Sequence, residues 1–191
     1  MPGAIAGDII GSVYEWSSAQ GRDFPLFSPR SDFTDDSVLT FAVARAILDA
    51  RAVGSDSPDY AGRMLDFGRR YPARGYGEMF NEWLQLDEQH PYNSYGNGSG
   101  MRVSPVGFAF DDEHVVLEQA RRSAMPTHDH PEGVKGAQSV ALAVWLARRG
   151  ATRDEIRSRI ETEFGCDLRS ARRSLPPTED LPARQRLEHD H

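Results

Sequence analysis

The sequence is poor in cysteine and in long apolar runs. Cys166 is the only cysteine of the 191-residue chain, so no internal disulfide can form, and a reducing compartment such as the cytoplasm is expected. No apolar run approaches the roughly 18 residues of a membrane span. Near the N-terminus, Asp8 interrupts the apolar stretch that a secretory signal would need. These absences predict a cytoplasmic protein without a membrane partner.

Positive charge is also scarce. Lys and Arg number 22 against 29 Asp and Glu, which gives a formal charge of -7. Because non-specific binding to phosphate backbones needs a basic surface, no nucleic-acid partner is expected. The sequence also has no Gly-x-Ser-x-Gly elbow, which argues against a serine hydrolase of that kind.

Sustained alternation of apolar and polar residues, the pattern of half-buried strands, is missing, whereas apolar residues recur at three- and four-residue spacing. This pattern predicts an all-α fold, and the chain length suits one compact domain. Gly3, Gly7 and Gly11 recur at every fourth position, which predicts that another element approaches one side of the first helix closely. Five helices are expected with both ends defined, over residues 2–16, 58–71, 113–124, 131–149 and 152–165. Two more are expected to begin after a Thr34 cap and just after Gly77, and a loop is expected at 93–100.

Two of these helices carry recognisable start signals. Pro58 suits a first helical turn, with Asp56 or Ser57 as its cap. Thr152 and Glu155 have the spacing of a capping box, in which each side chain accepts a hydrogen bond from the other residue's backbone. The helix starts at these two points are therefore predicted from local chemistry alone.

The sharpest chemical signal is Thr34-Asp35-Asp36 at a helix start. Adjacent carboxylates and a hydroxyl supply the hard oxygen ligands that Mg²⁺ or Mn²⁺ prefers, and the helix N-terminus stabilises negative charge. The same tripeptide is also ordinary capping chemistry. Glu15, a lone acid near a helix end, is by itself either a solvated residue or a ligand.

A second signal is the glycine-rich segment 94–102, Ser-Tyr-Gly-Asn-Gly-Ser-Gly-Met-Arg. Three glycines within five residues allow backbone amides to approach a phosphate, although the segment could equally be a flexible turn. It does not follow the strand-then-helix order of a dinucleotide fingerprint.

A third signal is Thr127-His128-Asp129-His130, just before a predicted helix. The histidines could bind a transition metal, hydrogen-bond to substrate or backbone, or stand beside a capping Thr127 or Asp129. The further Cys or His ligands of a zinc site cannot be placed with suitable spacing.

These pieces occur in a characteristic order. Four motifs follow one another along the chain. They are Gly7-Asp8 with residues 11–15, Phe33 to Ser37, residues 96–102 and residues 127–131. From about Gly3 to Leu168 this order resembles the ADP-ribosylglycohydrolases, including the dinitrogenase-reductase-activating glycohydrolases.

The resemblance implies an all-helical fold with a binuclear Mg²⁺ or Mn²⁺ centre at the base of a cleft, and it assigns roles to residues. The implied metal ligands are Thr34, Asp35 and Asp36; the implied catalytic residues are Glu15, Asp35 and Asp36; the implied substrate-binding residues are Gly96, Asn97, Gly98, Ser99, Gly100, Met101, His128 and His130. In such enzymes the metals orient the ribose hydroxyls and a water while the glycosidic bond breaks.

One family motif is missing from the sequence. Members of the family continue to a Gly-Gly-Asp-x-Asp-Thr motif with further metal ligands, and this chain contains no such motif. Residues 1–168 are therefore interpreted as the N-terminal portion of a C-terminally truncated domain, and 169–191 as a loosely ordered tail rich in arginine and containing a Pro-Pro pair.

Two functions follow as hypotheses. The first is metal-dependent hydrolysis of the glycosidic bond between ADP-ribose and a modified protein or small acceptor. The second is an ADP-ribose-binding module, or truncated pseudoenzyme, without turnover. Because a shortened domain would expose apolar surface, self-association or a complementing chain is also expected.

Overall fold

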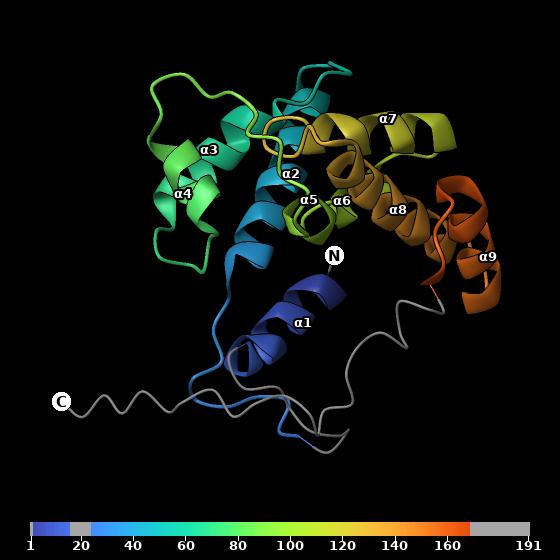
Figure 1. The fold of residues 1–191 in the computed structure, drawn as a ribbon, viewed down its shortest axis with the longest axis horizontal. Helices are drawn as coiled ribbons and strands as arrows, with labels where there is room; N and C mark the ends of the chain where they lie inside the picture. The colour runs from blue at the N-terminus through green and yellow to red at the C-terminus, as the bar shows by residue number, and fades with distance from the viewer. Residues whose placement is uncertain (1, 16–23, 169–191) are drawn as a thin grey trace.

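The all-α prediction is confirmed. The computed structural model describes residues 2–15 and 24–168, and every regular element within them is a helix (Figure 1). In chain order these elements are α1 Pro2–Gly11, η1 Ser12–Tyr14, α2 Asp35–Ala52, α3 Tyr60–Arg70, α4 Glu78–Gln85, α5 Gly98–Met101, α6 Ser104–Ala109, α7 Glu113–Ala124, α8 Pro131–Arg148 and α9 Arg153–Phe164. None of the described helices is long and apolar enough to span a membrane.

Helix α2 lies at the centre of the described chain. Figure 1 shows α3 and α4 on one side of it, α7, α8 and α9 on the other, and α1 beside its N-terminal end. One face of α2 is buried against α3 and α6, and α8 packs against α5, α6, α7 and α9. Among the fully buried side chains, Val43, Met64 and Leu142 come from three different helices. Each such burial stabilises the fold by about 1.5–3 kcal/mol.

The predicted helix-end signals are confirmed in most cases. Thr34 caps α2, since its hydroxyl accepts from the Asp36 amide, and Thr152 and Glu155 form the complete capping box of α9. Gly165 ends α9 in the left-handed conformation, at φ 61°, which glycine adopts without steric cost. These are contacts between near neighbours in the chain, which local sequence determines.

Other expectations were wrong at their boundaries. The first helix ends at Gly11 and continues only as the short 3₁₀ turn η1. Helix α3 begins at Tyr60 with Asp59 as its cap, so Asp56 and Ser57 do not cap it. Within the expected 93–100 loop, residues from Gly98 onward form α5, and α6 was not anticipated.

The glycines of the first helix do not have the close neighbour that their spacing predicted. A Cβ placed on Gly3, Gly7 or Gly11 would meet no described atom within 4 Å. The predicted tail at 169–191 lies outside the described residues.

Candidate functional site

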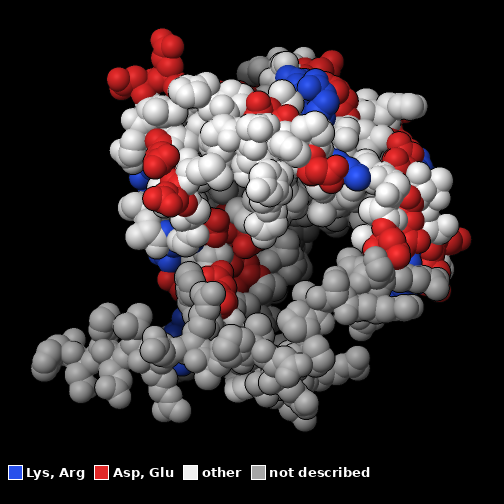
Figure 2. Space-filling model, viewed as in Figure 1, with Lys and Arg blue, Asp and Glu red and all other residues white. Residues whose placement is uncertain are grey.

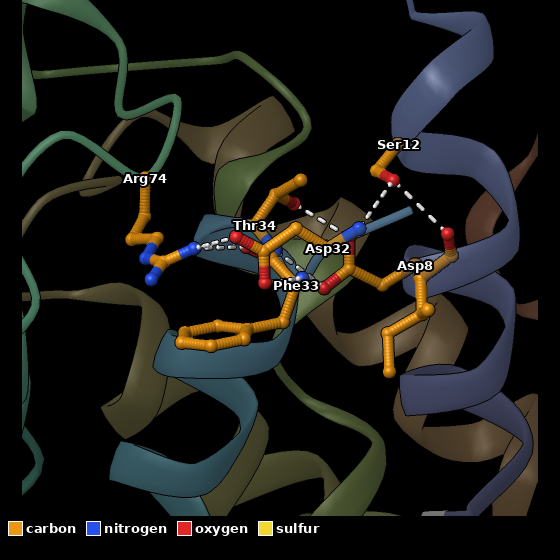
Figure 3. A network of polar contacts seen from close by, with 7 residues as sticks. Asp8, Ser12, Asp32, Phe33, Thr34 and Arg74 are labelled. Carbon is orange, nitrogen blue, oxygen red and sulfur yellow. Dashed lines mark hydrogen bonds and ion pairs between the residues drawn. The ribbon is translucent and has the colours of Figure 1, made fainter. Parts of the chain in front are cut away.

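Asp8 of α1 anchors the beginning of α2 (Figure 3). Its carboxylate accepts hydrogen bonds from the Thr34 amide at 2.9 Å, the Thr34 hydroxyl at 2.6 Å and the Ser37 amide at 3.1 Å. Close by, the Ser12 hydroxyl accepts a hydrogen bond from the Asp32 amide at 3.2 Å. Helix α1, through Asp8, and η1, through Ser12, therefore position the segment that leads into α2.

Arg74 holds the same segment from the opposite side (Figure 3). Its carbonyl accepts from the Asp35 amide at 2.7 Å, its guanidinium pairs with Asp32, and the guanidinium carbon lies 3.8 Å from the centre of the Phe33 ring. The amides of the first residues of α2 are thus satisfied by Asp8, Thr34 and Arg74. Helix capping accounts for Thr34 but leaves the Asp35 and Asp36 carboxylates without a capping role.

The Asp35 and Asp36 carboxylates lie in an environment with excess negative charge. Burial, the neighbouring Asp36 charge and the charges of Glu15 and Asp8 raise the pKa of Asp35 to about 7. Burial, followed by the charges of Asp8 and Glu15, also raises the pKa of Asp36. Figure 2 shows acidic side chains gathered in a recess on the face it displays. A cation at this position would relieve the repulsion among the four carboxylates.

The donors here suit a hard cation in kind, but they do not enclose one. Within residues 2–15 and 24–168, no group of three or more His, Cys, Asp or Glu side chains lies close enough together to hold a metal ion. The Thr34 hydroxyl is already engaged with Asp8 and the Asp36 amide. Asp35 and Asp36 are the carboxylates that α2 itself offers to a cation here, and Glu15 lies near them.

A cavity of about 320 Å³ connects the beginning of α2 with the glycine-rich turn. Its lining includes six of the residues that the sequence assigned to the site, namely Asp35, Gly96, Asn97, Gly98, Met101 and His128. Tyr92 and Arg102 add polar groups, and Leu39 and Phe80 add apolar surface. Segments about 60 and 90 residues apart in the chain thus meet around one ligand-sized space.

The glycine-rich turn is anchored by tertiary contacts. The Ser99 hydroxyl, which is buried, donates to the Gly133 carbonyl of α8 at 2.7 Å. The Asn97 carbonyl accepts from the amides of Gly100 and Met101. No described group accepts from the amides of Asn97, Gly98 or Ser99. The turn therefore combines fixed backbone with free donors, as an oxygen-rich ligand requires.

His128 and His130 have different environments. His128 is buried in the cavity wall, and burial together with the Arg102 charge lowers its pKa to about 4. His130 instead caps α8, accepting from the Glu132 amide at 3.1 Å, and its ring lies 5.3 Å from that of Tyr95. His128 is thus neutral at physiological pH and faces the cavity, whereas His130 contributes to helix capping.

The remaining candidates lie beside the cavity and do not line it. Glu15, Thr34 and Asp36 belong to the acidic region at the start of α2, and Ser99 and Gly100 face α8. Their predicted roles stay predictions.

Two residues of structural consequence were missed as site residues, Asp8 and Arg102. Asp8 carried a detectable signal, because it is the only charged residue in an otherwise apolar first helix. Arg102 is the last residue of the glycine-rich segment 94–102. It was missed because arginines are mostly exposed, so a surface position was expected for it.

Comparison with known proteins shows which family the chain is related to. The sequence profile of the family described as ADP-ribosylglycohydrolase matches residues 1–190. The chain belongs to this family. The match extends beyond Leu168, the end predicted for the resemblance from the sequence.

Relatives within the ADP-ribosylglycohydrolase family include vertebrate proteins named ADP-ribosylhydrolase ARH3. The Gallus gallus protein is 30% identical over 226 residues, covering 98% of this chain and 61% of the relative. The Homo sapiens protein is 31% identical over 185 residues, covering 81% of this chain and 50% of the relative. An Escherichia coli protein named YegU is 28% identical over 134 residues, covering 63% of this chain and 39% of the relative. The chain thus spans about half the length of the curated relatives it matches.

Proposed function

We propose that this chain binds ADP-ribose in the cavity between α2 and the glycine-rich turn, and that it takes part in metal-dependent hydrolysis of the bond linking ADP-ribose to a modified protein or small acceptor. The observation that carries the proposal is the composition of this one cavity. Asp35 lies on one side of the cavity, and Asn97, Gly98 and His128 lie on the other. The family relationship and the ARH3 relatives support the same reaction class.

The chain's own residues divide the proposed work. The amides of Asn97 and Gly98 would donate to phosphate or ribose oxygens, and neutral His128 would contribute a further hydrogen bond. Asp35 and Asp36 would hold Mg²⁺ or Mn²⁺, with Glu15 near the ribose. When bound, the metal supplies Lewis-acid stabilisation of the charge that develops as the glycosidic bond breaks.

A second candidate function is binding of ADP-ribose without turnover. It is favoured by one observation: the described acids do not form a group of three around a metal position. Because Asp35, Asp36 and the nearby Glu15 are not grouped around one position, a dication would bind weakly. The two candidates share the ligand and differ in whether the glycosidic bond is broken.

Calorimetric titration of ADP-ribose into the purified chain, with and without millimolar Mg²⁺ or Mn²⁺, tests the shared part of both candidates. We expect metal to strengthen binding, and Asp36→Asn to abolish that enhancement. Asp154→Asn is the matched control, because Asp154 is an exposed acid on α9, away from the cavity. Absence of binding under every condition would refute both candidates.

Release of ADP-ribose from modified proteins and from small ADP-ribosylated acceptors separates the candidates. Metal-dependent release that Asp35→Asn abolishes supports the hydrolase. Binding without release from any linkage supports the binding module.

A further inference from the structure

Arg102 is a buried arginine for which no described carboxylate serves as a partner. It follows α5, its exposed fraction is 0%, and it forms no ion pair with any described acid. Burial lowers its pKa to about 10, which still leaves it charged at neutral pH. Burying a charge without an ion-pair partner lowers the free energy of unfolding. The role of Arg102 therefore depends on which groups its guanidinium contacts and on what those contacts do.

The guanidinium of Arg102 is directed at the segment that carries His128. Its Nη2 donates to the Ser123 carbonyl at 3.0 Å and to the Thr127 hydroxyl oxygen at 2.8 Å, while its Nε has no described partner. The Thr127 hydroxyl oxygen lies in turn 2.8 Å from Nδ1 of His128. A continuous chain of hydrogen bonds therefore runs from Arg102 through Thr127 to the imidazole.

The chemistry of these groups sets the direction of the hydrogen bonds. A guanidinium can only donate, so the Thr127 oxygen accepts from Arg102. The same contacts place the Arg102 charge on the Nδ1 side of the His128 ring, where a positive charge favours a lone pair over a hydrogen. The Thr127 hydroxyl then donates to Nδ1 of His128, and the imidazole carries its own hydrogen on Nε2. The nearby Arg102 charge opposes a second proton on the ring.

The opposite edge of the imidazole faces the glycine-rich turn. A Cβ placed on Gly98 would lie 3.0 Å from Cε1 and 3.1 Å from Nε2 of His128. Only glycine at this position leaves that edge open, and both residues line the cavity. The Nε2 hydrogen is thereby presented beside the free amides of Asn97 and Gly98.

We propose that Arg102 is a positioning residue that, through Thr127, fixes His128 in the tautomer carrying its hydrogen on Nε2 and so presents one more donor to an oxygen of the bound ligand. The identity of that ligand as ADP-ribose rests on the proposed function. The tautomer, in contrast, is a property of the free protein. The two can therefore be tested separately.

Long-range ¹H–¹⁵N correlation spectra of the full ¹⁵N-labelled chain at neutral pH report the tautomer directly. We expect the His128 ring to show the pattern of a protonated Nε2 and an unprotonated Nδ1. His114, which is exposed on α7, serves as an internal reference for a ring that exchanges between tautomers. A His128 ring protonated at Nδ1 would overturn the inference.

Variants of Thr127 test whether the hydroxyl transmits the effect. Thr127→Val removes the hydroxyl at nearly constant volume, and Thr127→Ser restores it. We expect Thr127→Val to give mixed tautomers and about tenfold weaker ADP-ribose binding, and Thr127→Ser to restore both. If Thr127→Val keeps a single Nε2 tautomer, the proposed relay is refuted.

The Arg102 charge is tested with Arg102→Lys and Arg102→Met, each checked for cooperative unfolding in urea before its spectrum is interpreted. Lysine retains a donor cation and should preserve the tautomer more fully than methionine. Equal tautomer populations in folded samples of both variants would overturn the role of Arg102. If the parent chain shows the Nε2 tautomer but does not bind ADP-ribose, the proposed function fails while the relay stands.

Discussion

Asp8 has a larger structural role than its exposed neighbours in α1. It accepts three hydrogen bonds from Thr34 and Ser37 across 26 to 29 residues of sequence. We expect Asp8→Ala to lower the free energy of unfolding by about 2–3 kcal/mol, because several donors at a helix start lose a charged acceptor. Asp8→Asn, which keeps one acceptor oxygen, should cost less. Urea unfolding measures both, and equal stability of Asp8→Ala and the parent would contradict the assigned role.

Asp35 gives the chain a predictable dependence on pH. Its pKa rises from 3.8 to about 7 on folding, so the folded chain binds this proton more tightly than the unfolded chain. The contribution of Asp35 to stability therefore decreases as pH rises from about 4 to about 7. At pH 8 we expect Asp35→Asn to unfold at a higher urea concentration than the parent. The gain in the free energy of unfolding should be about 1–2 kcal/mol after allowance for solvent screening, and it should be small at pH 4. Both proteins are compared in the presence of a chelator, and a stability difference independent of pH would refute the shift.

Sequence patterns identified site residues where the signal was local and missed them where it was not. Thr34 was predictable as a cap because its partner, the Asp36 amide, is two residues away. Cavity-lining Asp35, Gly98 and His128 were assigned through family resemblance, since periodicity alone left each with an ordinary structural alternative. The buried position of Arg102 depends on packing between separate helices, which no local pattern encodes.

The same division between local and long-range information holds for the helices. Long periodic segments such as α7 and α8 were predicted to within a residue of their observed bounds. The short helices α5 and α6 were not, because four or six residues cannot stabilise a helix without tertiary contacts. Both pack against α8, which supplies those contacts.

The packing of α6 on α8 makes a glycine substitution informative. A Cβ on Gly107 would lie 2.6 Å from the Ala141 carbonyl oxygen and 2.8 Å from Cβ of Val144. We expect Gly107→Ala to destabilise the chain by about 1–3 kcal/mol, because two helices must separate to admit the methyl group. Gly136→Ala is the matched control within α8. A Cβ on Gly136 would meet no described atom within 4 Å, so it should be neutral or stabilising by up to about 1 kcal/mol. Thermal unfolding of the two variants measures the difference in stability. Equal effects of the two substitutions would contradict the close approach of α6 to α8 at Gly107.

At the scale of the whole molecule, α2 is apolar on more than its buried side. Phe41 and Leu48 have exposed fractions of 47% and 61%, and Phe108 of α6 is 48% exposed. These three side chains line a mainly apolar groove of about 430 Å³ between α2, α3 and α6. Exposed apolar side chains gathered in one groove are typical of an interaction surface. The groove therefore supports the expectation from sequence that the chain associates with itself or with a complementing partner.

Self-association through the groove can be tested by adding a charge at its centre. We expect the parent chain to show concentration-dependent association in sedimentation velocity, and Leu48→Glu to reduce it, because a carboxylate in an apolar contact loses hydration without gaining a partner. Val53→Glu is the matched control: Val53 is 78% exposed just beyond α2 and does not line the groove. Both variants add one negative charge, so a general increase in repulsion would affect them equally. Reduced association in Leu48→Glu alone would place the contact in the groove, whereas a monomeric parent chain at all concentrations would refute self-association through this surface.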